Sequence, residues 1–181
     1  YAFAGCKSLS NITIPNSVTE IRDGILSDCS SLTGLIIPNN ITSIGNYAFS
    51  NCLLLTSITI PKNVTKIGSF AFNYCYPTTI VVENGNTHYD SRDNCNAIIE
   101  TANNKLIKGC CNTTIPNTVT QIEGYAFVYH ACPSSITIPK SVVNIGLFSF
   151  YGCYNLSSIV VENGNPIYDS RDNCNAIIET A

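Results

Sequence analysis

Four cysteines in the first half of the chain recur at a constant spacing of 23 residues, at Cys6, Cys29, Cys52 and Cys75. A fixed period of this length is typical of repeat proteins, in which each repeat forms one coil and buries its apolar face only against neighbouring coils. The total of ten cysteines would also allow a disulfide framework. Because the cysteines follow the period of the chain, we interpret them as one column of a stack.

Other residue types follow the same period. A column of prolines, replaced twice by glutamate, contains Pro15, Pro38, Pro61, Glu83, Pro116, Pro139 and Glu162. The residue before each of them is Ile or Val, and this column predicts seven stacked coils, at Ile14, Ile37, Ile60, Val82, Ile115, Ile138 and Val161. A phenylalanine column follows further along each coil, at Phe3, Leu26, Phe49, Phe72, Phe127 and Phe150.

The segment before each proline, such as "ITIP", alternates apolar and hydroxyl residues. This period of two is typical of a half-buried strand, and proline ends a strand because it has no N–H to donate. No part of the chain shows a sustained helical period. We therefore predict a ladder of short parallel strands, with at most one helical turn in each coil near the Ala-Phe pair.

One interval is longer than the others, since Val82 and Ile115 lie 33 residues apart. The runs "AIIET" and "KLIKG" flank "ANN" there, which predicts a β-hairpin inserted at about 87–109. The segment Ile80–Ala102 recurs at Ile159–Ala181 with 21 of 23 positions identical, so a second, truncated copy is expected at 166–181. We predict a single solenoid domain over 1–181, and a chain that starts and stops within repeats is expected to be part of a longer protein.

Composition excludes several classes of protein. Charged residues make up only 12% of the chain and apolar residues 45%, which is not the composition of a disordered segment. The net charge is −3 with nine Lys and Arg, so no basic surface for nucleic acid is expected. Apolar runs are too short to cross a membrane, so no membrane insertion is expected.

The repeat L-x-x-I-x-I-P-x-x-V-x-x-I-G-x-x-A-F-x-x-C resembles the Treponema-type leucine-rich repeat of BspA-like surface proteins, and the resemblance covers the whole chain. It implies a mostly β fold: a right-handed leucine-rich-repeat solenoid of short parallel strands and loops with an inserted β-hairpin. It also implies an extracellular location on a bacterial cell surface, a role in attachment, and no catalytic residues or cofactor. The departures from the repeat are local, for example Ser149 in place of Ala and His130 in place of Cys.

The stretch "YDSRDNCNAIIET" occurs at Tyr89–Thr101 and again at Tyr168–Thr180. Asp90, Asp93 and Asn96 offer oxygen ligands for Ca²⁺, but neither a glycine turn nor a bidentate glutamate follows them. Asp, Ser and Asn also close tight turns through bonds to their own backbone. We favour a loop at the base of the hairpin over a metal site or a reactive site, with Arg92 pairing with a neighbouring aspartate.

The cysteine column could hold thiols or disulfides. Adjacent coils lie about 4.8 Å apart, which is farther than the ~3.5–4.5 Å between bridged Cβ atoms, so thiols are favoured throughout the column. For the cysteines near the hairpin, Cys95, Cys110 and Cys111, the sequence does not decide between thiols and disulfides. His130 close to Cys132 is a weak zinc signal, because it has no second ligand pair. No serine or cysteine lies in a sequence motif that would place a histidine and an orienting acid beside it. We therefore do not expect an enzyme.

Two surfaces are candidates for binding. The first is the outward strand column, composed of Thr13, Ile36, Thr59, Val81, Thr114, Thr137 and Val160. Because side chains alternate along a strand, this column faces outward when its neighbours face the core. The second is a predicted tyrosine edge in the loops after the phenylalanine column, composed of Tyr74, Tyr76, Tyr129, Tyr151 and Tyr154. Each surface also has an interpretation without binding. In that interpretation the outward column is an ordinary solvated strand, and the tyrosines cover the ends of the core.

The sequence thus predicts a non-catalytic surface module that binds host or bacterial proteins, or glycans, through an extended face. A structural spacer that holds another domain away from the cell surface is the alternative. Coil faces at the two ends of the chain leave end-to-end self-association open.

Overall fold

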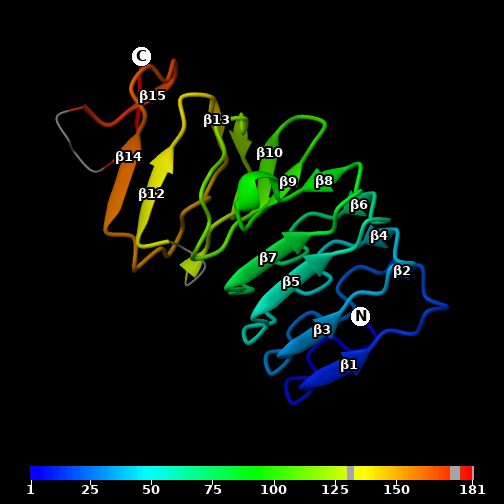
Figure 1. The fold of residues 1–181 in the computed structure, drawn as a ribbon. Helices are drawn as coiled ribbons and strands as arrows, with labels where there is room; N and C mark the ends of the chain where they lie inside the picture. The colour runs from blue at the N-terminus through cyan, green and yellow to red at the C-terminus, as the bar shows by residue number, and fades with distance from the viewer. Residues whose placement is uncertain (130–132, 172–175, 181) are drawn as a thin grey trace. The chain divides into compact units, whose positions relative to one another are not determined.

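The computed structural model describes residues 1–129, 133–171 and 176–180. The chain divides into two compact units, unit 1 at Tyr1–Asp90 and unit 2 at Ser91–Ala181, and each is described by itself. Both are built from short strands and turns, and Figure 1 labels the strands in chain order. The predicted mostly β solenoid of leucine-rich repeats is confirmed.

Unit 1 contains two ladders of parallel strands. In four successive coils, the segment before the proline or glutamate forms a strand. These strands are β1 (Asn11–Thr13), β3 (Gly34–Ile36), β5 (Ser57–Ile60) and β7 (Thr79–Val82), and they lie side by side in Figure 1. Here β1 pairs with β3, and β5 pairs with β7. A second ladder consists of β2 (Glu20–Ile21), β4 (Ser43–Ile44) and β6 (Lys66–Ile67), and β8 (Tyr89–Asp90) ends the unit.

The predicted alternation gives unit 1 its core. Along β5, Ile58 and Ile60 are buried whereas Ser57 and Thr59 are exposed, and β7 repeats this pattern. Fully buried residues of the other columns complete the interior, among them Leu32, Ile41, Phe49, Cys52 and Leu55. Since each coil supplies only a few of these side chains, the interior depends on stacking.

Unit 2 begins with a short 3-10 turn, η1 (Arg92–Asn94). The strands β9 (Ile98–Glu100) and β10 (Lys105–Lys108) then pair antiparallel, which confirms the predicted hairpin. Next, β11 (Gln121–Ile122) pairs in parallel with β10 and with β13 (Asn144–Ile145). Finally β12 (Ser135–Ile138) pairs with β14 (Ser158–Val161), and β15 (Tyr168–Asp169) pairs antiparallel with β16 (Ile178–Glu179).

One expected strand is absent. The coil that contains Thr114 was predicted to continue the parallel ladder, but residues 113–115 do not lie in a strand. The Thr114 amide donates instead to the carbonyl of Cys95, and the Thr113 hydroxyl donates to the carbonyl of Asn96. The residues at the base of the hairpin therefore take the hydrogen bonds that a neighbouring strand would otherwise provide. The Ala-Phe pairs lie in turns and bends of the described chain and not in helices.

The turns around the Ala-Phe pairs are built on left-handed residues. In unit 1 one column of positive φ contains Gly24, Tyr47 and Phe70, and a second contains Gly5, Asp28, Asn51 and Tyr74. Every second amide of the turn points at the next coil: the Tyr47, Phe49 and Asn51 amides donate to the carbonyls of Ser69, Ala71 and Asn73, at 3.1, 2.8 and 2.8 Å. The left-handed residues thus let an irregular turn hydrogen-bond from coil to coil as a strand would.

Candidate functional site

The predicted strand face of unit 1 consists of exposed residues in register. Thr13 on β1 lies beside Ile36 on β3, and Thr59 on β5 lies beside Val81 on β7. Ile36, the last residue of β3, is 82% exposed, and Val81 on β7 is 44% exposed. A shallow hollow of about 540 Å³ borders Thr13 and Ile36 and is otherwise lined by asparagines, a proline and aliphatic residues.

The strand face of unit 2 is shorter. Thr137 on β12 lies beside Val160 on β14, and Val160 is 46% exposed. Thr114 is exposed but belongs to the coil without a strand. Thr114 and Thr137 both line a hollow of about 390 Å³. The outward direction of these side chains agrees with the sequence analysis.

The five tyrosines of the predicted edge do not form one group. Tyr74 and Tyr76 belong to unit 1 and are half-buried, and burial raises the pKa of the Tyr76 phenol. Tyr129, Tyr151 and Tyr154 belong to unit 2, where their rings contact one another. Tyr151 is 50% exposed and Tyr154 is 79% exposed, so unit 2 has the more accessible surface.

Sequence reasoning missed a second set of aromatic residues, which directly precede the Ala-Phe pairs. Tyr47 and Phe70 stack in unit 1 with ring centroids 5.2 Å apart, and Tyr125 and Phe148 contact each other in unit 2 at 5.4 Å. All four have φ between 53° and 60°. The signal that could have revealed them is Gly24, which occupies the same column and is the residue type that a left-handed position favours.

The cysteine column of unit 1 contains thiols, as predicted. The Cys29, Cys52 and Cys75 side chains are buried and donate to the carbonyls of Phe3, Leu26 and Phe49 in the preceding coil, at 3.2, 3.3 and 3.0 Å. A hydrogen bond with Cys75, together with burial, raises the pKa of the Cys52 thiol well above its ordinary value. These thiols are therefore protonated and serve in packing. They are not nucleophiles, because a nucleophilic cysteine needs a lowered pKa.

At Cys153 the prediction of a thiol is wrong, because this residue is disulfide-bonded. The distance argument applies only to cysteines that face each other in neighbouring coils, and His130 occupies the column in the coil before Cys153. His130 and Cys132, the weak zinc candidate, lie outside the described residues. Near the hairpin, Cys95, Cys110 and Cys111 are thiols, and burial raises the pKa of Cys110.

The duplicated stretch uses its polar groups to hold loops together. The Ser91 hydroxyl donates to the Ala97 carbonyl at 2.7 Å, and Ser170 makes the same bond to Ala176 at 2.7 Å. Arg92 donates to the side chains of Asn104 at 2.8 Å and Thr118 at 3.1 Å, across the hairpin. Among the described residues, no group of three or more His, Cys, Asp or Glu side chains could hold a metal ion.

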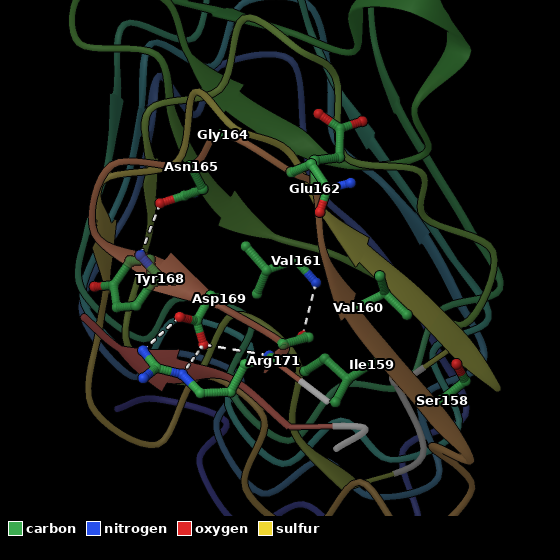
Figure 2. Close-up of a pocket in the computed structure, with 12 residues that line it drawn as sticks. Ser158, Ile159, Val160, Val161, Glu162, Gly164, Asn165, Tyr168, Asp169 and Arg171 are labelled. Carbon is green, nitrogen blue, oxygen red and sulfur yellow. Dashed lines mark hydrogen bonds and ion pairs between the residues drawn. The ribbon is translucent and has the colours of Figure 1, made fainter. Parts of the chain in front are cut away.

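The second copy of this stretch lines a hollow of about 700 Å³, with β14 on one side and β15 on the other (Figure 2). Arg171 pairs with Asp169 at 2.5 Å, and this hydrogen bond lowers the pKa of the Asp169 carboxyl. The Ser170 hydroxyl accepts a hydrogen bond from the Val161 amide at 3.0 Å. The polar groups here bond to each other and to the backbone, which is a structural role.

A stack of short parallel strands, a proline or glutamate after the strands β1, β3, β5, β7, β12 and β14, and a mostly buried phenylalanine column together define a leucine-rich-repeat protein. The family model described as the BspA type leucine rich repeat region matches residues 1–99 and 101–174 in six copies. The chain belongs to this family. Leucine-rich repeats of this kind are typically non-enzymatic.

Several solved structures share the fold. A leucine rich cell surface protein from Faecalibacterium prausnitzii is 36% identical over 87% of this chain, with a TM-score of 0.77. A leucine-rich repeat protein from Bacteroides ovatus is 26% identical over 90% of the chain, with a TM-score of 0.57. The pneumococcal vaccine antigen PcpA is 21% identical over 80% of the chain, with a TM-score of 0.67, and shows the fold alone.

The chain spans less than half of the length of these three proteins, at 43%, 45% and 39%. No curated protein sequence is significantly similar to it. None of the helical residues in the described part of the chain forms a segment long and apolar enough to cross a membrane.

Proposed function

We propose that the chain is a non-catalytic recognition module of a bacterial cell-surface protein, which binds host or bacterial proteins, or glycans, through its strand faces. The observation that carries this proposal is the exposure of Ile36, at 82%, within a column of threonines. Exposure of one aliphatic side chain is ordinary by itself, so the proposal rests on Ile36 together with the hollow of about 540 Å³ that it lines with Thr13. Support for the surface location comes from the family and from the Faecalibacterium cell surface protein.

The chemistry of the face fits an extended ligand. Threonine and valine lose little side-chain entropy when a partner covers them. Each coil adds one such position, so affinity would be spread over several coils. The buried thiols with raised pKa values give no nucleophile, which supports a module without catalytic activity.

The test is biolayer interferometry of the chain against a panel of extracellular-matrix proteins and surface glycans. A triple variant, Thr13→Glu, Thr59→Glu and Thr137→Glu, places a charge on three coils of the strand faces. We expect saturable binding of the wild type and a loss of about tenfold or more in the variant, because a charge would have to be desolvated at the interface.

A matched control carries the same added charge elsewhere. Thr19, Ser69 and Asn144 are exposed and lie outside the strand faces, so the variant Thr19→Glu, Ser69→Glu, Asn144→Glu should bind as the wild type does. Equal binding by all three proteins would reject the strand faces as the recognition surface. An absence of binding across the panel would favour the alternative, in which the repeats are a spacer that holds another domain away from the cell.

A further inference from the structure

Unit 2 carries a connected group of five aromatic rings on its turns, which we name the aromatic cluster: Tyr125, Tyr129, Phe148, Tyr151 and Tyr154. The ring centroids of Tyr125 and Phe148 are 5.4 Å apart, and those of Phe148 and Tyr151 are 5.8 Å apart. Tyr129 contacts Tyr151 at 5.5 Å and Tyr154 at 6.1 Å. The cluster therefore forms a continuous aromatic surface that two neighbouring coils supply.

The rings are accessible. Tyr154 is 79% exposed, Phe148 is 55% exposed and Tyr151 is 50% exposed, and the adjacent Leu147 is 81% exposed. Single exposed apolar residues are ordinary on protein surfaces, whereas a contiguous group of this kind marks an interaction site. Tyrosine is also favoured at such sites, because it offers a large contact area for the loss of two torsions.

The cluster is held in place by the fold at a cost in backbone strain. Tyr125, Tyr129 and Phe148 have φ values of 60°, 52° and 57°, a region that disfavours aromatic residues by roughly 1–2 kcal/mol each. Gly152 makes room for Tyr129, since a Cβ atom there would lie 2.7 Å from a carbon of the Tyr129 ring. Strained residues of this kind concentrate at sites where a defined shape is used.

The interior beneath the cluster is rigid. The Phe127 and Phe150 rings stack with centroids 5.3 Å apart and planes 11° apart, and Phe127 is fully buried. Both residues lie in the same turns as the cluster, so they fix the backbone from which the exposed rings project. A ligand would therefore meet a surface that is already ordered, which lowers the entropy lost on binding.

The cluster has no charge of its own. Residues 124–129 and 145–161, which contain all five rings, include no Asp, Glu, Lys or Arg. The nearest acidic residue in sequence, Glu123, is paired with Lys105 at 2.7 Å. A charged ligand such as a phosphate or an acidic polysaccharide would find no counter-charge on these two segments, which favours a neutral ligand.

We propose that the aromatic cluster binds a neutral glycan, with single rings stacking on the C–H faces of single hexose units. The π face of a ring is negative and attracts C–H groups, which are weakly positive. The planes of Phe148 and Tyr151 are 84° apart, and those of Tyr129 and Tyr151 are 86° apart, so one flat apolar partner surface cannot cover them together. A chain of small faces, as sugar units provide, can contact rings of different orientation. This inference rests on the proposed recognition role but uses a surface other than the strand faces.

The experiment is native gel electrophoresis of the chain through gels that contain dextran, laminarin, mannan or xylan, each a neutral polysaccharide. We expect at least one of them to retard the wild type. The variants Tyr154→Ala and Tyr151→Ala should each weaken the retardation about tenfold, which corresponds to the loss of one ring-stacking contact. Tyr47→Ala, which removes an exposed ring of unit 1, is the matched control and should migrate as the wild type does.

Thermal unfolding of each variant separates loss of binding from loss of folding, and Tyr154→Phe provides a variant that keeps the ring. Retention of affinity by Tyr154→Phe together with its loss in Tyr154→Ala would support stacking. The proposal is overturned if no neutral polysaccharide retards the wild type, or if both alanine variants migrate normally. Binding of a proline-rich peptide without binding of a polysaccharide would also overturn it. The Thr13→Glu, Thr59→Glu, Thr137→Glu variant should keep its glycan retardation, so the two proposals can fail independently.

Discussion

The left-handed turn positions of unit 1 and unit 2 share one column of a tyrosine followed by a phenylalanine, but differ in the second column. In unit 1 the column that starts at Gly5 continues with Asp28 and Asn51, which adopt positive φ readily, and ends with Tyr74. In unit 2 the same column contains Tyr129 and then Gly152. The equivalent ring pairs differ less, since Tyr47 and Phe70 are 23° from coplanar in unit 1 and Tyr125 and Phe148 are 36° from coplanar in unit 2. In unit 2, Phe148 also meets Tyr151 at 84°.

The interior shows no such difference. Phe49 and Phe72 stack at 5.4 Å in unit 1, and Phe127 and Phe150 stack at 5.3 Å in unit 2. The stacking distance between coils fixes the interior columns, because every buried side chain must fit against its equivalent in the next coil. The turn positions face solvent, so their chemistry can change from coil to coil. Differences in recognition between repeats of this kind are therefore expected in the turns.

The largest predicted effect tests the equivalence of the two interiors. Phe49→Ala and Phe127→Ala should each destabilise the chain by about 3–5 kcal/mol, because each leaves a cavity beneath a stacked ring. Urea denaturation followed by tyrosine fluorescence measures both. A difference of more than about 2 kcal/mol between the two variants would show that the interiors are not equivalent, despite their matching geometry.

The second prediction uses two glycines of the same turn column. Gly5→Ala should destabilise by about 1 kcal/mol, because φ is 75° and the added Cβ would meet nothing within 4 Å. Gly152→Ala should destabilise by about 2–3 kcal/mol, because the new Cβ would also displace the Tyr129 ring. Thermal unfolding and near-ultraviolet circular dichroism of both variants measure this. Equal losses would mean that Tyr129 can move without penalty, and the aromatic cluster would then not be a fixed surface.

The third prediction concerns pH. Burial raises the pKa of Cys29 and Cys110, and the bond with Cys75 and burial raise that of Cys52. The folded chain therefore favours the protonated thiols. Their contribution to stability is complete below the pKa of an unfolded cysteine, about 8.5, and is lost as the pH rises above it.

Urea denaturation at pH 7 and pH 9 under reducing conditions should show a loss of stability at the higher pH. The loss is expected to be no larger than that of Gly152→Ala, since a thiol of the unfolded chain with a pKa near 8.5 is about three quarters ionised at pH 9. Cys52→Ala removes one of the contributing thiols and should reduce the difference between the two pH values. An unchanged difference in this variant would contradict the role assigned to Cys52.

The smallest predicted effect involves the exposed pair at the hollow of Figure 2. The hydrogen bond from Arg171 lowers the pKa of Asp169, so this pair contributes stability above the pKa of an unfolded aspartate and loses it as the pH falls. NMR titration of the Asp169 carboxyl should give a pKa below the usual value near 3.9, and Arg171→Gln should restore that value. Denaturation curves of Arg171→Gln should overlay those of the wild type, because an exposed pair adds little stability.

Much of this fold could be predicted from the period alone. The Ile/Val, Phe and Cys columns located the interior, and the longer interval located the hairpin β9–β10. The absence of a strand at Thr114 could not be predicted, because the "TTIP" pattern there matches the pattern of the other coils. The backbone leaves the strand because Thr114 and Thr113 bond to the carbonyls of Cys95 and Asn96. The disulfide at Cys153 depends on spatial neighbours that a column alignment does not reveal.

The candidate surfaces were predicted less completely. The outward threonines follow from strand alternation, so Thr13, Thr59 and Thr137 were found directly. The tyrosine edge was placed by counting residues after the phenylalanine column, which located Tyr129, Tyr151 and Tyr154 but not their partners. Tyr125 and Phe148 escaped because aromatic residues conceal a left-handed turn that glycine or asparagine would have indicated.

The bonds between coils also bear on how such chains evolve. The thiol of Cys52 reaches back 26 residues to the Leu26 carbonyl, and Asn46 reaches back 23 residues to Asp23. Each of these offsets joins one coil to the next and none reaches farther. Insertion or loss of one whole repeat therefore restores every partner, whereas a shift of a single residue breaks the entire pattern. Recombination between repeats can thus change the length of the exposed strand face in one genetic event without the need to find a new stable fold.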